Sequence, residues 1–426
     1  MAAPLNKKTE CIYDLFGRLP HKLHVGTPPK ESLHKFAVLF SEATQKLVED
    51  EIEADDCMGG SFQYGWPVGQ TEFRESLAAF LSREYKSPVN PDNLVQTNGC
   101  TMALIFMLDQ LFPQRTTVYV EKMTYFRTMA IFRAWHYDYK PVRIETDGID
   151  VEDLEKVWSR DLKDADPSDE NYSAVLYLVP QYHNPFGTVL SAEKSKRVVQ
   201  LARKFNVLVI SEDVYNLHYF DGQVHQRLFL YDDPKDANYG KGHVVSSGSF
   251  SKIFIPSIRL GWVEANATVR RRCFETSPIT CSGGSMNCFT GAVISKILKS
   301  EAAHDHVELN RIDAKKKMQI TIDVLEKELP SSCQIYHQPT GGYFIYVLLP
   351  REIDSTKTCM IMKDEYGIAV NDGKLAWTAD VDDPDYYIAN GIRISIPYLD
   401  AKHLELAISE FCRCLTKLSI ENEVST

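Results

Sequence analysis

Hydrophobic residues recur along the chain at two spacings, which predict helices in some segments and strands in others. Residues 71–84, 100–111 and 191–205 place apolar side chains on one side of a helix. Gly99 stands in a turn before the second segment, and Ser191 is suited to cap the third. These three segments are therefore predicted to be helices.

Short apolar runs alternate with these helices and predict buried strands. The runs cover residues 117–120, 174–179, 207–210 and 244–245. Apolar strands that alternate with helices are typical of a largely parallel sheet covered on both faces. The fold class expected from this pattern is α/β.

Polar residues follow several of these strands. Asn98-Gly99, Asn184, Glu212 and Lys252 each come after a predicted strand. Ligands of parallel sheets bind at the carboxyl ends of the strands, so we expect these residues to converge there.

The pattern changes after about residue 300, where long polar helices accompany strands near residues 343–349 and 392–396. We expect an N-terminal segment, residues 1–50, that joins the small domain and lines the pocket. A large ligand-binding domain is expected over residues 51–295, and a small α+β domain over residues 296–426.

Composition narrows the class of protein. The chain has 426 residues, 44% of them hydrophobic, and a net charge of -11. An acidic chain binds nucleic acid and anionic membranes poorly, and no apolar run is long enough to span a bilayer. The ten cysteines form no metal-binding or disulfide pattern, and no signal peptide is evident. We expect a cytoplasmic protein without a bound metal, and a mitochondrial location is less favoured.

The most specific chemical signal surrounds one lysine. Ser249, Ser251 and Lys252 are followed by Arg259 and Gly261. A lysine amine among small residues can condense with an aldehyde, while hydroxyls and a guanidinium bind a phosphate. Together they indicate an anchor for pyridoxal 5'-phosphate.

This Ser-x-Ser-Lys segment followed by Arg-x-Gly resembles the class I/II, fold type I aminotransferases, close to the subgroup of 2-aminoadipate, kynurenine and aromatic aminotransferases. The resemblance extends from about Tyr64 to about Ser395. It implies a large domain with a mainly parallel sheet and a smaller α+β domain. Lys252 would hold the cofactor and then act as general base.

The resemblance also assigns roles to residues around the cofactor. Gly99, Cys100 and Thr101 would bind the phosphate at a helix N-terminus, together with Ser249, Ser251 and Arg259. Cys100 departs from the family, which usually has a hydroxyl there. The residues implied for the ring are Tyr125, which would stack on it, and Asn184 and Tyr215, which would hydrogen-bond its phenolic oxygen.

The carboxylate expected at the ring nitrogen is a second departure. Relatives usually have Asp three residues before the tyrosine, where this chain has Glu212, and Asp213 is its neighbour. Adjacent residues of a strand point to opposite faces, so only one of them faces the ring. We favour Glu212 because a one-residue slip would reverse every side chain, but Asp213 remains an alternative.

Two further parts of the site are implied by the resemblance. Arg393 would bind the substrate α-carboxylate, Asn184 would also contact the substrate, and Gly26 would belong to a segment lining the substrate pocket. Tyr64 would reach the phosphate of a neighbouring subunit, which implies a homodimer with shared active sites.

The predicted function is transfer of an amino group from an L-amino acid to a 2-oxo acid, with 2-oxoglutarate as the expected acceptor. The donor is of the 2-aminoadipate, aromatic or branched type. Alternatives on the same fold are a β-lyase or decarboxylase, or a non-catalytic paralogue that binds the cofactor. A ligand-sensing regulator is less favoured, because the aminotransferase-like region begins too early for a DNA-binding domain.

Overall fold

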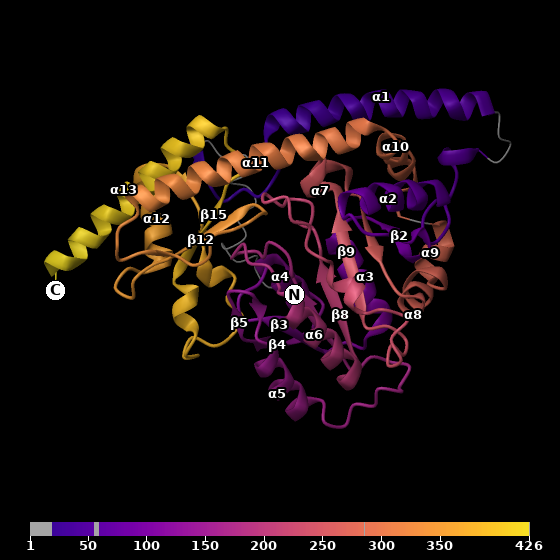
Figure 1. Ribbon diagram of the computed structural model, residues 1–426, viewed down its shortest axis with the longest axis horizontal. Helices are drawn as coiled ribbons and strands as arrows, with labels where there is room; N and C mark the ends of the chain where they lie inside the picture. Colours follow the sequence, from indigo (N-terminus) through magenta and orange to yellow (C-terminus); the bar gives the residue numbers. More distant parts are fainter. Residues whose placement is uncertain (1–18, 55–58, 285, 426) are drawn as a thin grey trace, which may run out of the picture.

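A seven-stranded sheet forms the centre of the protein, as the computed structural model shows for residues 19–54, 59–284 and 286–425 (Figure 1). The strand order is β2-β10-β9-β8-β7-β3-β4, and β10 is antiparallel to both neighbours while the other paired strands are parallel. The strands are β2 (Leu94–Thr97), β3 (Thr117–Glu121), β4 (Asp138–Val142), β7 (Ala174–Leu178), β8 (Val207–Glu212), β9 (Val244–Ser249) and β10 (Gly261–Glu264).

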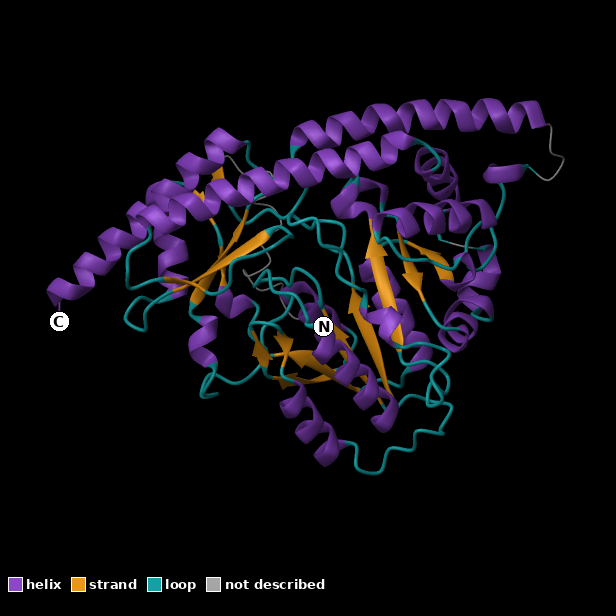
Figure 2. Ribbon diagram, viewed as in Figure 1, coloured by secondary structure: helices purple, strands orange, loops and turns teal. Residues whose placement is uncertain are grey.

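Helices cover this sheet on both faces (Figure 2). Successive side chains of a strand point to opposite faces. In β7, Val175 packs on the face covered by helix α3 (Cys100–Leu111). Leu176 packs on the other face, with Trp158 of helix α5 (Val151–Asp161) and Val198 of helix α6 (Ala192–Phe205). Both faces are therefore apolar, which explains the continuous hydrophobic runs in the strands.

The helices have the following bounds: α1 (Lys30–Ala54), α2 (Thr71–Glu84), α3 (Cys100–Leu111), α4 (Phe126–Ala134), α5 (Val151–Asp161), α6 (Ala192–Phe205), α7 (Phe250–Ile253), α8 (Ala267–Arg270), α9 (Pro278–Gly283), α10 (Cys288–Leu298), α11 (Glu301–Glu328), α12 (Ser355–Tyr366) and α13 (Ala401–Ser425). None of the helices in the described part of the chain is long and apolar enough to cross a membrane.

A second, antiparallel sheet lies beside α11, α12 and α13, in the order β11-β12-β15-β14. Its strands are β11 (Gln334–Ile335), β12 (Phe344–Leu348), β14 (Asn371–Asp372) and β15 (Gly391–Ser395). Two short pairs complete the strands: β1 (His21–Lys22) with β13 (Ile368–Ala369), and β5 (Ile144–Glu145) with β6 (Gly148–Ile149).

The N-terminal segment contacts both parts of the molecule. Its strand β1 pairs with β13 beside the small sheet, and helix α1 then runs along α11 (Figure 1). Phe36 of α1 stacks on Phe254 with ring centroids 4.4 Å apart, next to the large sheet. The predicted domain boundaries at residues 50 and 295 stay a prediction.

The predicted helices are confirmed. Residues 71–84 and 100–111 are α2 and α3, and α6 begins directly after Ser191, whose side chain accepts a hydrogen bond from the backbone N–H of Lys194. The predicted α/β class is confirmed as well. The antiparallel strand β10 was not predicted.

Candidate active site

Two neighbouring cavities lie at the carboxyl ends of β8 and β9, and residues 24–27 of the N-terminal segment line one of them. Their volumes are about 170 and 200 Å³, and Tyr125, Asn184, Tyr215 and Lys252 line both of them. The predicted convergence of residues at the strand ends is therefore seen in the structure. Lys252 stands at the boundary between the two cavities.

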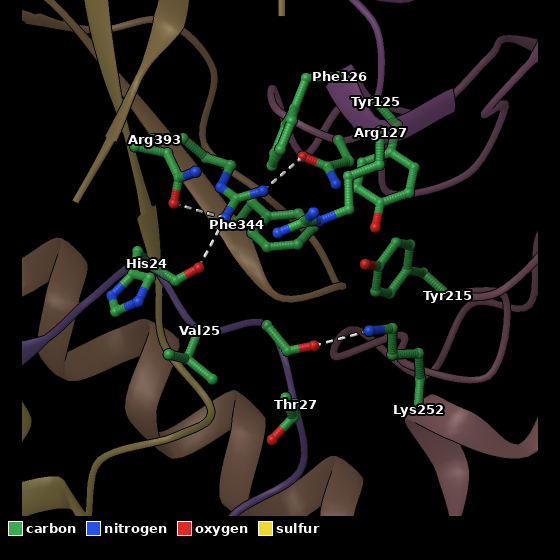
Figure 3. Close-up of a pocket in the computed structure, with 13 residues that line it drawn as sticks. His24, Val25, Thr27, Tyr125, Phe126, Arg127, Tyr215, Lys252, Phe344 and Arg393 are labelled. Carbon is green, nitrogen blue, oxygen red and sulfur yellow. Dashed lines mark hydrogen bonds between the residues drawn. The ribbon is translucent and has the colours of Figure 1, made fainter. Parts of the chain in front are cut away.

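Lys252 lies in the short helix α7, directly after β9. Its Nζ donates a hydrogen bond to the backbone oxygen of Gly26 at 2.7 Å (Figure 3). Tyr343 donates from its hydroxyl to the Lys252 backbone oxygen at 2.8 Å, which fixes the lysine's position. Burial, followed by the positive charge of Arg393, lowers the pKa of Lys252 to about 8. About a tenth of the amine is thus neutral at pH 7, far more than for an ordinary lysine.

An anion cradle occupies the other end of the 200 Å³ cavity. Gly99 has a φ of 82°, and a Cβ built on it would lie 3.3 Å from Nη2 of Arg259 and 3.9 Å from Oγ of Ser249. The backbone of Gly99 thus approaches both groups closely, directly before the N-terminus of α3. Arg259 also donates to Oγ of Ser251 at 3.3 Å. A helix N-terminus, hydroxyls and a guanidinium at one point suit a phosphate.

The backbone of Arg259 is held in an uncommon conformation, with a φ of 48°. Asn287 donates from its side-chain amide to the backbone oxygens of Ile258 at 2.9 Å and Arg259 at 3.0 Å. These two bonds hold the turn that aims the guanidinium. Asn287 was not predicted, because a polar residue at a distant helix start carries no sequence signal for this contact.

The two candidate carboxylates point in different directions. Glu212 lines the 200 Å³ cavity and accepts a hydrogen bond from the hydroxyl of Tyr177. Asp213 does not line it; this carboxylate accepts hydrogen bonds from Ser211 at 2.8 Å and from Ser246. Burial raises the pKa of both carboxyl groups. The geometry thus favours Glu212 as the carboxylate that faces the cavity.

Tyr177 is an unpredicted member of this group. It lies on β7 beside β8, and its hydroxyl accepts a hydrogen bond from Thr128 at 3.1 Å while donating to Glu212. The side chain of Glu212 is thereby positioned by a neighbouring strand. The apolar run of residues 174–179 predicted a buried strand and carries no signal for this contact.

Arg393 lines the 170 Å³ cavity and is held in place by three hydrogen bonds. It donates to Oδ1 of Asn184 at 3.0 Å, to the backbone oxygen of His24 at 2.8 Å and to Oδ1 of Asn371 at 2.9 Å (Figure 3). The guanidinium also lies 4.4 Å from the centroid of the Phe344 ring. A fixed cation at this position suits a carboxylate ligand.

Tyr125 and Tyr215 provide the aromatic walls shared by both cavities. Tyr125 directly precedes α4, and Tyr215 is buried against the edge of Phe344, with ring centroids 5.4 Å apart. Burial raises the pKa of both phenols, so both hydroxyls stay protonated at neutral pH.

The structure brings most of the predicted site residues together but separates Tyr64 from them. Tyr64 is 80% exposed and lines neither cavity. Cys100 and Thr101 line the cavity that contains the anion cradle, as predicted from their place at the start of α3. Other lining residues were not predicted: His24, Val25, Thr27, Phe126, Arg127, Phe344 and Asn371.

Comparison with known proteins identifies the family. Residues 22–411 match the model of the family described as aminotransferase class I and II. The chain belongs to this family. Its cofactor is pyridoxal 5'-phosphate, and the protein is an aminotransferase. The cavity with Lys252 at one end and the cradle of Gly99, Ser249 and Arg259 at the other fits that cofactor.

Curated relatives and solved structures agree with this assignment. The aromatic-amino-acid aminotransferase 1 of Thermococcus litoralis is 22% identical over 88% of this chain and 84% of its own length. The 2-aminoadipate transaminase of Thermus thermophilus is 23% identical over 74% of this chain and 72% of its own. The structure of the multiple substrate aminotransferase from Thermococcus profundus has a TM-score of 0.81 and 20% identity, and the match covers 99% of this chain and 96% of that one.

Proposed function

We propose that this aminotransferase transfers the amino group of an L-amino acid, of the 2-aminoadipate, aromatic or branched type, to 2-oxoglutarate. One observation carries the proposal: the amine of Lys252 and the guanidinium of Arg393 face the same 170 Å³ cavity. A substrate held there through its α-carboxylate has its Cα next to a lysine base.

Arg393 and Lys252 have separate roles in the proposed reaction. Arg393, held by Asn184 and Asn371, binds the α-carboxylate and orients the Cα–H bond. Lys252, with its pKa lowered to about 8, takes the proton from Cα and returns it as a general acid. The cofactor, when bound, supplies the electron sink for this proton transfer.

Glu212 is the residue we assign to the ring nitrogen of the cofactor. It is the carboxylate that lines the cavity, and Tyr177 holds it from behind. A carboxylate at that nitrogen keeps the ring protonated, which strengthens the electron sink. The extra methylene relative to Asp is thus accommodated by the position of Tyr177.

The donor class is supported by the walls of the cavity and by the named relatives. Phe126 and Phe344 line the cavity together with Tyr125, and apolar rings there suit an aromatic or aliphatic side chain. The two relatives described above are named for aromatic amino acids and for 2-aminoadipate.

We further propose that the protein is a homodimer with shared active sites. Tyr64 is exposed, and so are Phe62 and Phe289, whose rings stack with centroids 5.9 Å apart. Exposed apolar groups of this kind mark surfaces that bind protein. The exposed large apolar residues of the segments 62–66 and 279–289 are here called the aromatic patch: Phe62, Tyr64, Trp66, Ile279 and Phe289.

The test is an absorbance spectrum of the protein loaded with pyridoxal 5'-phosphate, before and after single amino acids are added. We expect the band of the lysine-bound cofactor to convert to that of pyridoxamine phosphate and to return with 2-oxoglutarate. Lys252→Ala should abolish the first band, while the exposed Lys315→Ala on α11 should keep it. Ammonia or carbon dioxide released without amino transfer would contradict the proposal and indicate a lyase or decarboxylase.

A further inference from the structure

Arg127 points its guanidinium into the 170 Å³ cavity, on the side opposite the backbone of Arg393 (Figure 3). The site described so far gives this second arginine no role. Its recorded contact is with the Phe126 ring, at 5.1 Å from the centroid. Within the described part of the chain, Arg127 forms no hydrogen bond and no ion pair.

The charge of the cavity is one-sided. Three cationic side chains, Arg127, Arg393 and Lys252, line it, and none of its lining residues in the described part of the chain is an aspartate or glutamate. Cations crowded into a half-buried space repel one another unless an anion joins them. A ligand with two negative groups therefore balances this cavity better than a ligand with one.

The position of Arg127 in its helix also favours an anionic ligand. Arg127 is the second residue of α4, which begins at Phe126. A cation at a helix N-terminus is unfavourable, because the helix dipole is positive there. An anion bound at this point would be favoured by both the dipole and the guanidinium. The N-terminus of α4 and the guanidinium of Arg127 thus both attract a negatively charged ligand.

We propose that Arg127 binds the second carboxylate of a dicarboxylic substrate, while Arg393 binds the α-carboxylate. This inference rests on the proposed function and refines it: one of the two substrates is an acidic amino acid or its 2-oxo acid. Arg393 is already anchored by Asn184, His24 and Asn371, so it marks the α-carboxylate end. Arg127, which has no such anchors, marks the side-chain end.

The role is one of substrate selection. Because the distal carboxylate does not react, its contact with Arg127 is present in both the ground state and the transition state. Loss of such a uniform contact raises KM and leaves kcat nearly unchanged. Aromatic substrates lack the distal carboxylate, and their KM should stay within about twofold of the wild-type value.

The first experiment measures the kinetics of Arg127→Gln in the cofactor-loaded protein. We expect KM for 2-oxoglutarate and for acidic amino acids to rise on the order of 10- to 100-fold, as for loss of a charged hydrogen bond. Arg127→Lys, which keeps the charge but not the two-pronged geometry, should recover part of the loss. The matched control is Arg133→Gln, an exposed arginine of the same helix outside the cavity.

A second experiment needs no turnover, so it separates failure of this inference from failure of the proposed function. Binding of glutarate and of 3-phenylpropanoate to the cofactor-loaded protein is measured by calorimetry. Glutarate should bind the wild type and lose on the order of 10- to 100-fold in affinity in Arg127→Gln, while 3-phenylpropanoate should be little affected. Equal losses for both acids, or no loss for glutarate, would overturn the assignment. A wild type that shows this selectivity but transfers no amino group would instead contradict the proposed function.

Discussion

At the residue scale, the burial of Lys252 and the positive charge of Arg393 control the protonation of the lysine amine. Its pKa is lowered to about 8, below the ordinary value, so protonation is disfavoured and the neutral amine accumulates as the pH rises through 8. Only the neutral amine condenses with an aldehyde. The rate at which cofactor-free protein captures pyridoxal 5'-phosphate should therefore rise about tenfold per pH unit below pH 8 and level off above it.

Stopped-flow absorbance measures this rate. The reference compound is Nα-acetyl-lysine, whose side-chain amine is free, and it corrects for the ionisation of the cofactor itself. Arg393→Gln removes the second largest cause of the shift and should move the midpoint to higher pH. Arg133→Gln, whose side chain is exposed, should leave the midpoint in place. A midpoint near that of Nα-acetyl-lysine in the wild type would show that the pocket does not lower the pKa.

The sequence could single out four residues that line one cavity, because their types are restricted and their spacing is short: Ser249, Ser251, Lys252 and Arg259. Tyr177 and Arg127 could not be singled out in this way. Tyr177 meets Glu212 across two paired strands, and its surroundings in sequence are those of any core strand. Arg127 opposes the dipole in the first turn of α4, but this helix was not predicted from the sequence. Nothing in the sequence showed which way the Arg127 side chain points.

At the scale of elements, periodicity predicted helices α2, α3 and α6, but it did not predict α5, which also packs on the sheet. It did not predict β10, which is only four residues long and begins with a glycine. This glycine is required by close contacts with other parts of the fold. A Cβ on Gly261 would lie 2.5 Å from the backbone oxygen of Gly248 on β9 and 2.8 Å from Cα of Gly99. The close approach of β10 thus supports the turn before α3.

This contact gives a prediction for Gly261→Ala. Both clashing atoms belong to the backbone, so β10 must move away from β9 and from the anion cradle. We expect a loss of stability of about 1–3 kcal/mol in urea unfolding and a weaker affinity for pyridoxal 5'-phosphate.

The control for Gly261→Ala is Gly222→Ala. That glycine has a φ of 77° and open space around it, so the substitution strains only the backbone. It should lower stability by about 1 kcal/mol and leave cofactor affinity unchanged. Equal cofactor affinities in the two variants would show that the approach of β10 does not shape the cradle.

At the scale of the whole molecule, the site combines parts of the chain that are far apart in sequence. Gly26, Lys252 and Arg393 meet at one cavity although more than a hundred residues separate each from the next. The sequence predicted two regions with different patterns but not how they face each other. That arrangement depends on side-chain packing between the two sheets and the N-terminal segment, which periodicity does not encode.

The proposed dimer makes the last prediction, because Tyr64 lies outside the cavities of its own chain. If its hydroxyl completes the partner's phosphate site, Tyr64→Phe should weaken cofactor binding by about tenfold while the mass in solution stays at twice the 48.5 kDa of one chain. Trp66→Glu in the aromatic patch should instead yield monomers in light scattering, since a charge in an apolar contact is costly.

Shared sites can then be tested by mixing two defective chains. In a dimer of Lys252→Ala with Tyr64→Phe, one site carries both defects and the other carries neither. The activity is assayed at a pyridoxal 5'-phosphate concentration low enough that sites without the Tyr64 hydroxyl stay largely empty. Under this condition, co-expression of the two chains should restore roughly a quarter of wild-type activity, since half of the dimers are mixed and each has one intact site. Sites built from a single chain would gain nothing from mixing, because every site would keep one defect. Recovery of activity therefore requires that Tyr64 and Lys252 act across the two-fold axis.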